Sequence, residues 1–372
     1  MVSTFGIIPL FREWCFSIIL LLMIMNLVSE SAIIEKLEYT TMDTEVIFST
    51  STKLKGKWLK EKAHKGSDAL SIRAISFNTW LTGRSVNNGL EKVVKHIKYL
   101  NPDIAALQEV HPFDIVKNIT SLLGKPWIAI SKNASNPDTI ILTQHEEEVV
   151  DIYYGFGAQV LVTKQGHTFP VNFFSMHLNY VSYGPYAAQN KMVNAKELIM
   201  KGEDSKDGNG RAANIRELLV NPKFQEWSKA AESAGPPVII AGDFNCPSHI
   251  DWIEETKSLH GGWTFEWPAT KLLTDIGMID SFREIHSDVM ETPGHTWSTV
   301  QNATGWEWDY SIPEPQDRID FIFYKGSKSL KPKKSYTYSG DPKQKPQPIP
   351  NHANNDYPSD HYTVVTDFDV LL

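Results

Sequence analysis

The feature that most constrains this chain is a series of apolar runs that each begin or end at a polar side chain. The polar residues at these positions are Asn78, Glu109, His177, Asp243 with Asn245, Asp320, and the pair Asp360 and His361. Ionised side chains beside apolar runs are costly to bury unless they are paired or bind a metal. Loops at strand ends also converge into clefts. The pattern therefore predicts a sheet-based domain that gathers these groups into one site.

Alternation and helical spacing divide the rest of the chain into strands and helices. Strand-like runs occupy 71–78, 104–109, 138–143, 158–163, 170–177, 237–244, 318–324 and 361–370. Helical spacing occurs at 90–97, 186–201 and 212–233. Many strands with a few interspersed helices indicate a layered α/β or α+β domain. The Pro- and Lys-rich stretch 326–358 has no periodicity, so we expect it to be a long loop.

The N-terminus has the pattern of a secretory signal peptide. Arg12 precedes an apolar run that extends from Trp14 to Val28, and small residues follow. That run is too short for a comfortable membrane span, so residues 1–31 are predicted to be a signal peptide, with an uncleaved signal anchor as the alternative. Residues 32–70 are expected to form a leader or a peripheral segment. We therefore expect a protein that is secreted or lies in the lumen of the secretory pathway.

Cysteine and sequon positions bear on the same expectation. Cys15 lies in the expected signal peptide, which leaves Cys246 as a lone thiol without an internal disulfide partner. A free cysteine is more often buried and inert than reactive, and we expect this for Cys246. N-x-S/T sequons at Asn118, Asn133 and Asn302 predict a glycoprotein if the chain enters the secretory pathway.

The charge balance restricts how a phosphate could be bound. The formal net charge is −8 and the pI is about 5.9, unlike the strongly basic balance of many nucleic-acid binders. A phosphate-bearing substrate must then meet local positive charge or a metal, because the field of the whole protein does not attract it.

The inventory of strand-end residues suits metal-assisted phosphoryl chemistry. Carboxylate and amide oxygens are hard ligands of the kind that Mg²⁺, Mn²⁺ and Ca²⁺ prefer. Two histidines supply acid–base function near neutral pH. The sequence has no His/Cys set with zinc spacing, no Gly-rich phosphate loop and no G-x-S-x-G elbow.

Taken in order, the polar motifs resemble those of the endonuclease/exonuclease/phosphatase superfamily, the DNase I-like enzymes. The motifs are Asn78, Gln108-Glu109, His177-Leu178, Gly242-Asp-Phe-Asn245, Arg318-Ile-Asp320 and Ser359-Asp-His361. The resemblance covers 71–372 as one domain and looks like a secreted subgroup. It implies an α/β fold, a four-layer α/β/β/α sandwich.

The resemblance also implies a metal ligand set and a water-activating pair. Glu109 is expected to be the principal ligand, helped by Asn78 and Asp360, and Mg²⁺ is the expected ion, with Mn²⁺ or Ca²⁺ as alternatives. His361, oriented by Asp320, is expected to act on the attacking water.

The remaining carried-over roles concern the phosphoryl group. Asp243 is a second candidate for water activation, whereas Asn245 and His177 are expected to hold phosphoryl oxygens. His177 needs an orienting partner, and Asp138 is the acidic residue near the start of the strand at 138–143. We predict an Asp138 carboxylate oxygen within about 2.6–3.2 Å of a His177 ring nitrogen.

These assignments predict a divalent-metal-dependent phosphodiesterase acting on a nucleic acid or a phospholipid headgroup. A phosphomonoesterase on a sugar or inositol phosphate is one alternative, and a non-catalytic binding module is another. His111 stands where DNase I has an arginine after its Gln-Glu motif, which weakens the case for double-stranded DNA.

Some other residues have competing interpretations. His249 and Asp251 are expected to form a local hydrogen-bonded pair. Trp306, Trp308 and Tyr310 would form either a stacking or membrane strip or a half-buried strand. The lysines of 326–358 are expected either to be solvated or to attract phosphates.

Overall fold

The computed structural model describes residues 70–111, 115–131, 137–152, 155–205, 210–303 and 311–371, with no side-chain detail for 146–152. The expected signal peptide, almost all of the expected leader, the Asn133 sequon and the Trp306–Tyr310 strip lie outside the described residues. Among the described residues, no helix has the length and apolar character needed to cross a membrane.

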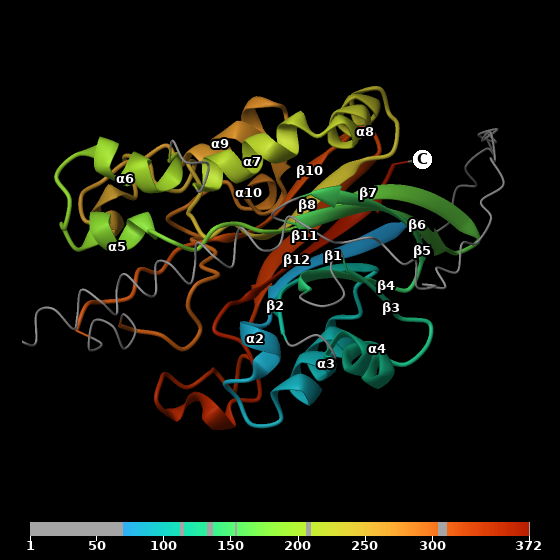
Figure 1. Ribbon diagram of the computed structural model, residues 1–372, viewed down its shortest axis with the longest axis horizontal. Coiled ribbons are helices and arrows are strands. Elements are labelled where there is room, and N and C mark those ends of the chain that lie inside the picture. The colour runs from blue at the N-terminus through green and yellow to red at the C-terminus, as the bar shows by residue number, and fades with distance from the viewer. Residues whose placement is uncertain are drawn as a thin grey trace, which may run out of the picture. The chain divides into compact units, whose positions relative to one another are not determined.

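Two six-stranded sheets form the centre of the domain (Figure 1). The first sheet has the order β11 (Leu330–Tyr338), β12 (Thr363–Val370), β1 (Ser71–Asn78), β2 (Ile104–Val110), β4 (Asp138–Thr143) and β3 (Ile128–Ile130). Only the β1–β2 pair in this sheet is parallel among the described pairings. The carboxyl ends of β1 and β2 therefore lie at the same edge.

The second sheet repeats this arrangement. Its order is β5 (Glu146–Ile152), β6 (Gly155–Lys164), β7 (His167–His177), β8 (Val238–Asp243), β10 (Asp320–Lys325) and β9 (Ile279–Asp280). The β7–β8 pair is parallel, and the other pairs described here are antiparallel. The carboxyl ends of β7 and β8 also share one edge.

Helices cover the outer face of each sheet, which confirms the predicted four-layer α/β/β/α sandwich (Figure 1). On the first sheet lie α3 (Gly89–Leu100) and α4 (Ile115–Leu123), whereas α2 (Trp80–Gly83) follows β1 directly. On the second sheet lie α5 (Gly184–Gln189), α6 (Lys196–Glu203), α7 (Arg211–Val220), α8 (Pro222–Glu232) and α9 (Pro268–Asp275), while α10 (Ser281–Ile285) contacts β10 and β11. Short 3₁₀ turns, η1 (Lys257–His260) and η3 (Asn351–Asn354), lie in the loops. Three buried apolar clusters fill the three spaces between the layers.

The expected long loop at 326–358 is wrong in its first part, because β11 lies there. Leu330, Pro332 and Ser335 are buried, whereas Lys331 and Lys333 are exposed. A bulge between Pro332 and Lys334 interrupts the alternation, and edge strands are commonly protected by lysine and proline. These features conceal the strand from a search for period-two alternation.

The predicted helices at 186–201 and 212–233 are each two helices. The first divides into α5 and α6 because residues 190–195 are not helical. The second divides at Pro222, which lacks the N–H that a helix interior needs and starts α8 instead. The Asn221 side chain caps α8 by accepting from the Lys223 and Phe224 amides.

Candidate active site

Three of the predicted site residues form a row across the second sheet. The strand register places His177 of β7 beside Asp243 of β8, and Asp243 beside Asp320 of β10. Directly paired residues of neighbouring strands point to the same face of a sheet. Backbone pairing alone therefore brings an imidazole and two carboxylates together at one edge.

Asp243 is the centre of this row. It is almost fully buried, and its Oδ2 accepts a 2.9 Å hydrogen bond from Asn78 Nδ2, which reaches across from the first sheet. The same oxygen lies 3.8 Å from His177 Nε2 and 3.7 Å from His361 Nε2. Its Oδ1 accepts from the Asn245 backbone N–H at 2.8 Å. One carboxylate oxygen thus faces two imidazoles.

The predicted contact between Asp138 and His177 is confirmed. His177 Nδ1 lies 3.0 Å from Asp138 Oδ2 and 3.3 Å from Oδ1, and Asp138 Oδ1 lies 3.3 Å from His111 Nε2. Burial of the His177 ring opposes its protonated form. The hydrogen bond to Asp138 and the charges of Asp138 and Asp243 outweigh burial and raise the pKa of His177 to about 9. His177 is therefore poised to act as a hydrogen-bond donor at neutral pH.

His361 has its own carboxylate partner. His361 Nδ1 lies 2.9 Å from Asp320 Oδ2, and both groups are buried. Thr296 Oγ1 accepts from the Ile319 and Asp320 amides, at 2.8 and 2.9 Å, which fixes the start of β10. Burial disfavours the imidazolium, but the charges of Asp320 and Asp243 raise the pKa of His361 well above its usual value.

The expected metal ligands lie on the other side of Asp243. Asn78 Nδ2 donates to Glu109 Oε1 at 3.1 Å, and the Leu81 backbone N–H donates to Glu109 Oε2 at 3.1 Å. The backbone of Glu109 is left-handed, with φ of 56°, and the β2–β4 register shifts between Leu107 and Val110. This irregularity places Glu109 where the regular ladder has stopped.

Asp360 supplies a second carboxylate beside Glu109. Its Oδ2 accepts from Gln301 Nε2 at 3.3 Å, whereas its buried Oδ1 has no hydrogen-bond partner. Burial is the main cause that raises the pKa of Asp360 to about 8, and the negative charge of Glu109 adds to it against the effect of His361. A buried oxygen without a partner, next to a second carboxylate, fits a hard divalent cation.

A different group of acidic and histidine residues also has metal-like spacing. Asp243, Asp320 and His361 place one ligand atom each within 4.8 Å of one another. Their contacts argue for an acid–base role, because Asp320 already bonds His361 Nδ1 and Asp243 already accepts from Asn78. We therefore keep Glu109, Asp360 and Asn78 as the candidate ligands.

The two asparagines of the site have different hydrogen-bond capacity. Both N–H groups of Asn78 are used by Glu109 and Asp243, and its Oδ1 accepts from the Trp80 amide at 3.0 Å. Asn245 Nδ2 donates to the Leu178 carbonyl at 3.0 Å, which leaves its other N–H for a ligand. Asn245 is thus the asparagine able to donate to a phosphoryl oxygen.

Some residues that hold the site together were missed by sequence reasoning. Ser359 Oγ donates to the Asn78 carbonyl at 2.6 Å and accepts from the His361 amide at 3.0 Å, so it ties the end of β1 to the segment that leads into β12 of the same sheet. The Trp297 ring lies 4.7 Å from that of His361, centre to centre. The Ser-Asp-His motif could have indicated Ser359, whereas nothing in the local pattern marks Trp297.

These groups line one cleft of about 1100 Å³. Glu109, His177, Asn245, Asp360 and His361 form its polar part. The other wall comes from 180–184 and from α5 and α6. A cleft of this size is ample for a phosphate ester with sizeable substituents.

The predicted local pair of His249 and Asp251 is wrong. Asp251 instead accepts from the Nε atoms of Arg283, at 2.7 Å, and Arg318, at 2.9 Å. His249 Nδ1 lies 2.9 Å from Thr270 Oγ1. Arg318, part of the motif before Asp320, is therefore a buried structural residue.

Cys246 is buried as predicted, and burial raises its pKa well above the usual value. This thiol is not positioned to be reactive.

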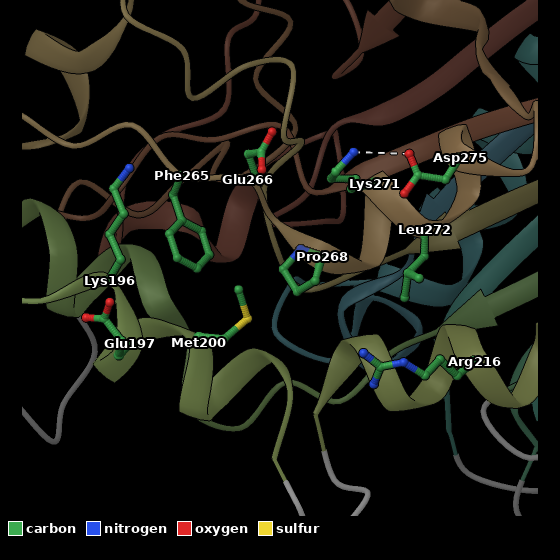
Figure 2. Close-up of a pocket in the computed structure, with 10 residues that line it drawn as sticks. All are labelled: Lys196, Glu197, Met200, Arg216, Phe265, Glu266, Pro268, Lys271, Leu272 and Asp275. Atoms are coloured by element: carbon green, nitrogen blue, oxygen red, sulfur yellow. Dashed lines mark hydrogen bonds and ion pairs between the residues drawn. The ribbon is translucent and has the colours of Figure 1, made fainter.

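A smaller cavity of about 430 Å³ lies between α6, α7 and α9 (Figure 2). Lys271 pairs with Asp275 at 3.1 Å, as the dashed line shows, and Arg216 pairs with Asp204 at 2.5 Å. Lys271 and Arg216 are thus neutralised by neighbours, and the lining carboxylates Glu197 and Glu266 further disfavour an anionic ligand.

The chain matches a known family over most of its length and has a closely similar relative. Residues 75–361 match the model of the Endonuclease/Exonuclease/phosphatase family. An uncharacterized protein of Caenorhabditis elegans is 47 % identical over 305 residues, which are 81 % of this chain and 92 % of that protein.

Several solved structures are also similar. Truncated TDP2 of C. elegans has a TM-score of 0.47 at 18 % identity, over 80 % of this chain and 98 % of that one. An AP endonuclease from Archaeoglobus fulgidus has a TM-score of 0.47 at 15 % identity, over 80 % and 100 %. The human nocturnin catalytic domain, with a bound sulfate anion, has a TM-score of 0.46 at 17 % identity, over 82 % and 96 %.

Proposed function

The chain belongs to the endonuclease/exonuclease/phosphatase family, and from this premise we propose that it is a divalent-metal-dependent phosphodiesterase. One observation carries the proposal. Two histidines, each held by its own carboxylate, face the same oxygen of Asp243. A phosphoryl group bound there would meet an acid–base pair on one side and a candidate cation site on the other.

We assign water activation to Asp243 and His361. Asp243 Oδ2 and His361 Nε2 are 3.7 Å apart, so one water can contact both atoms. Asp320 holds His361 through Nδ1 and, with Asp243, favours its imidazolium form, so His361 Nε2–H orients the water while Asp243 Oδ2 accepts the proton that the attack releases. Asp243 polarises the same water and holds the ring in place.

His177 and Asn245 bind the phosphoryl oxygens in this scheme. Asp138 holds the Nδ1 side of His177, so its Nε2–H is directed toward the Asp243 side of the cleft. The free N–H of Asn245 is a second donor that adds no like charge. These donors stabilise charge that develops on the phosphoryl group.

Glu109 and Asp360, with Asn78 Oδ1, are the residues that would hold the cation, and Mg²⁺ is our first choice because all the donors are oxygens. The ion supplies Lewis-acid stabilisation of the phosphoryl oxygens.

The test compares a small diester with a monoester. The full chain is assayed on methyl p-nitrophenyl phosphate and on p-nitrophenyl phosphate, with Mg²⁺ or with EDTA. We expect Mg²⁺-dependent hydrolysis of the diester, lost with EDTA and in Glu109→Gln. Glu226→Gln serves as the control, because Glu226 is 65 % exposed and pairs with Lys223.

Other results of this assay would favour one of the alternative functions. Preferential hydrolysis of the monoester would favour a phosphomonoesterase. Cation binding without hydrolysis of either ester would favour a non-catalytic module and would contradict the proposal.

We also propose that the protein enters the secretory pathway. The apolar N-terminal segment supports this, and the sequon residues Asn118 and Asn302 are both exposed and accessible to glycosylation.

A further inference from the structure

Large apolar side chains are exposed along one wall of the cleft. Tyr180 is 73 % exposed, Val181 56 %, Met192 50 % and Leu198 43 %. All four line the same cleft as Glu109 and the two histidines of the site. Large exposed apolar side chains that gather beside a polar site mark a surface that receives an apolar partner.

Buried polar contacts hold the apolar wall of the cleft in place. Arg211, which is fully buried, donates to the Val181 carbonyl at 3.1 Å and pairs with buried Glu203 at 2.9 Å. The Asn179 amide donates to Asn214 Oδ1 at 3.0 Å. These contacts tie the segment after β7 to α6 and α7, so Val181 is held facing solvent instead of being free to fold into the core.

The charge of the cleft argues against a long nucleic acid. Apart from the imidazoles of His177 and His361, which face the reacting phosphoryl group, the described lining has one lysine, Lys201, and no arginine, whereas Glu109, Asp138 and Asp360 are carboxylates. A strand of nucleic acid carries flanking phosphates that need several cations. The lysines of β11 and of 343–345 do not line the cleft, so they do not supply that charge.

From these observations we propose that the substrate is a phospholipid, whose hydrocarbon part lies on the wall formed by Val181, Met192 and Leu198 while its phosphodiester reaches Asp243. This deepens the proposed function and rests on it. The cleft is continuous from the wall to the histidines, and its volume of about 1100 Å³ accommodates a headgroup with part of a chain. The exposed rim would contact the surface of the lipid aggregate.

The experiment compares substrates that differ in the hydrocarbon part. The lipids are sphingomyelin and dioleoylphosphatidylcholine in neutral detergent micelles. Glycerophosphocholine is the matched diester without chains, methyl p-nitrophenyl phosphate reports the chemistry alone, and a single-stranded oligodeoxynucleotide represents the nucleic-acid alternative. Released headgroup, or product nucleotide, gives kcat/KM for each.

Two pairs of surface residues provide matched variants. Val181→Asn with Leu198→Gln makes the wall polar. Val220→Asn with Leu122→Gln makes the same replacements at residues that are 67 % and 41 % exposed and lie outside the cleft. Neither pair removes a buried apolar contact, so both proteins should fold, which circular dichroism checks.

We expect kcat/KM for at least one lipid to exceed that for glycerophosphocholine by at least tenfold. The wall variant should lower the ratio of lipid to methyl p-nitrophenyl phosphate activity at least tenfold, and the control variant should leave that ratio unchanged. Equal activity on chain-bearing and chain-free diesters, an unchanged ratio in the wall variant, or faster cleavage of the oligonucleotide would each overturn the proposal.

A binding measurement separates this inference from the proposed function. Co-sedimentation with phosphatidylcholine vesicles is measured for Glu109→Gln, alone and with the wall replacements. Binding that the wall replacements abolish supports the lipid surface even if no diester is hydrolysed. Absence of binding, together with hydrolysis of the small diester, would refute the lipid substrate and leave the phosphodiesterase proposal standing.

Discussion

Replacing Asp138 by asparagine tests whether His177 works as a protonated donor. His177 is 11 % exposed by its side chain, and Asp138 is 43 % exposed. Burial of His177 disfavours its protonated form, and the contact with Asp138 is the largest influence that opposes burial. Asparagine can still accept a hydrogen bond from Nδ1 but carries no charge. The pKa of His177 should therefore fall in Asp138→Asn.

The size of the effect follows from the raised pKa. The pKa of His177 rises from the usual 6.5 to about 9. At 1.36 kcal/mol per pKa unit, this rise corresponds to about 3 kcal/mol of stabilisation of the imidazolium. Because Asp138 is partly exposed, water screens its charge, and we assign to Asp138 about half of that energy. The pKa of His177 should then fall by roughly one unit in Asp138→Asn. We expect an about three- to tenfold loss of kcat/KM near pH 8.5 that shrinks toward pH 6, where both proteins keep the imidazolium.

The assay is the pH dependence of kcat/KM for methyl p-nitrophenyl phosphate with Mg²⁺, supported by an NMR titration of the His177 ring. Asp288→Asn is the surface control. His177→Ala and the double variant complete a cycle, in which Asp138→Asn should add little once His177 is gone, because residues acting as a unit are not additive. A loss that is the same at every pH, or full multiplication of the two single losses, would refute the reasoning.

Three further predictions concern other parts of the chain. Asp320→Asn and His361→Ala should be strongly non-additive in kcat, since Asp320 bonds His361 Nδ1 at 2.9 Å, and multiplicative losses in the double variant would argue against that coupling. Burial lowers the pKa of His260 to about 4. Between pH 6.5 and 4, the unfolded chain therefore binds a proton at His260 that the folded chain does not bind. The free energy of unfolding should then decrease as the pH falls through that range. His260→Phe should reduce the drop in Tm between pH 7 and 4.5, and an identical drop in both proteins would count against this assignment. Expression in a secreting eukaryotic cell should yield a protein whose mobility increases on glycosidase treatment and changes less in Asn118→Gln and Asn302→Gln, whereas an unmodified chain would contradict the secretory proposal.

The strand-end residues were predictable from sequence because buried strands have a clear signature. The apolar runs before Glu109 and Asp243 are buried along almost their whole length, so a polar side chain at their end stands out. Asp138 was found for a similar reason, since it begins the next recognisable strand. Its partner His177 lies 39 residues away, and the link came from the resemblance and not from spacing.

The parts that sequence reasoning missed depend on contacts between distant segments. Asp251 was assigned to its neighbour His249, but two arginines from other elements bind it instead. The role of Ser359 is visible only once its hydroxyl is seen bridging to the Asn78 carbonyl, 281 residues away. The wall combines Leu198, on the short helix α6, with Val181 and Met192 from segments that are not helical, so no sequence periodicity reveals a binding face.

The register between β7, β8 and β10 has a consequence for how such a protein can change. His177, Asp243 and Asp320 keep their places through backbone pairing, so an insertion or deletion within any of these strands would turn alternate side chains to the opposite face and dismantle the row. The wall at 180–202 lies in the connection between β7 and β8, outside that pairing. In the proposed assignment, the reacting groups and the apolar wall therefore lie on separable parts of the fold, and exchange of the wall segment would change the substrate range while the reacting groups stay where the sheet puts them.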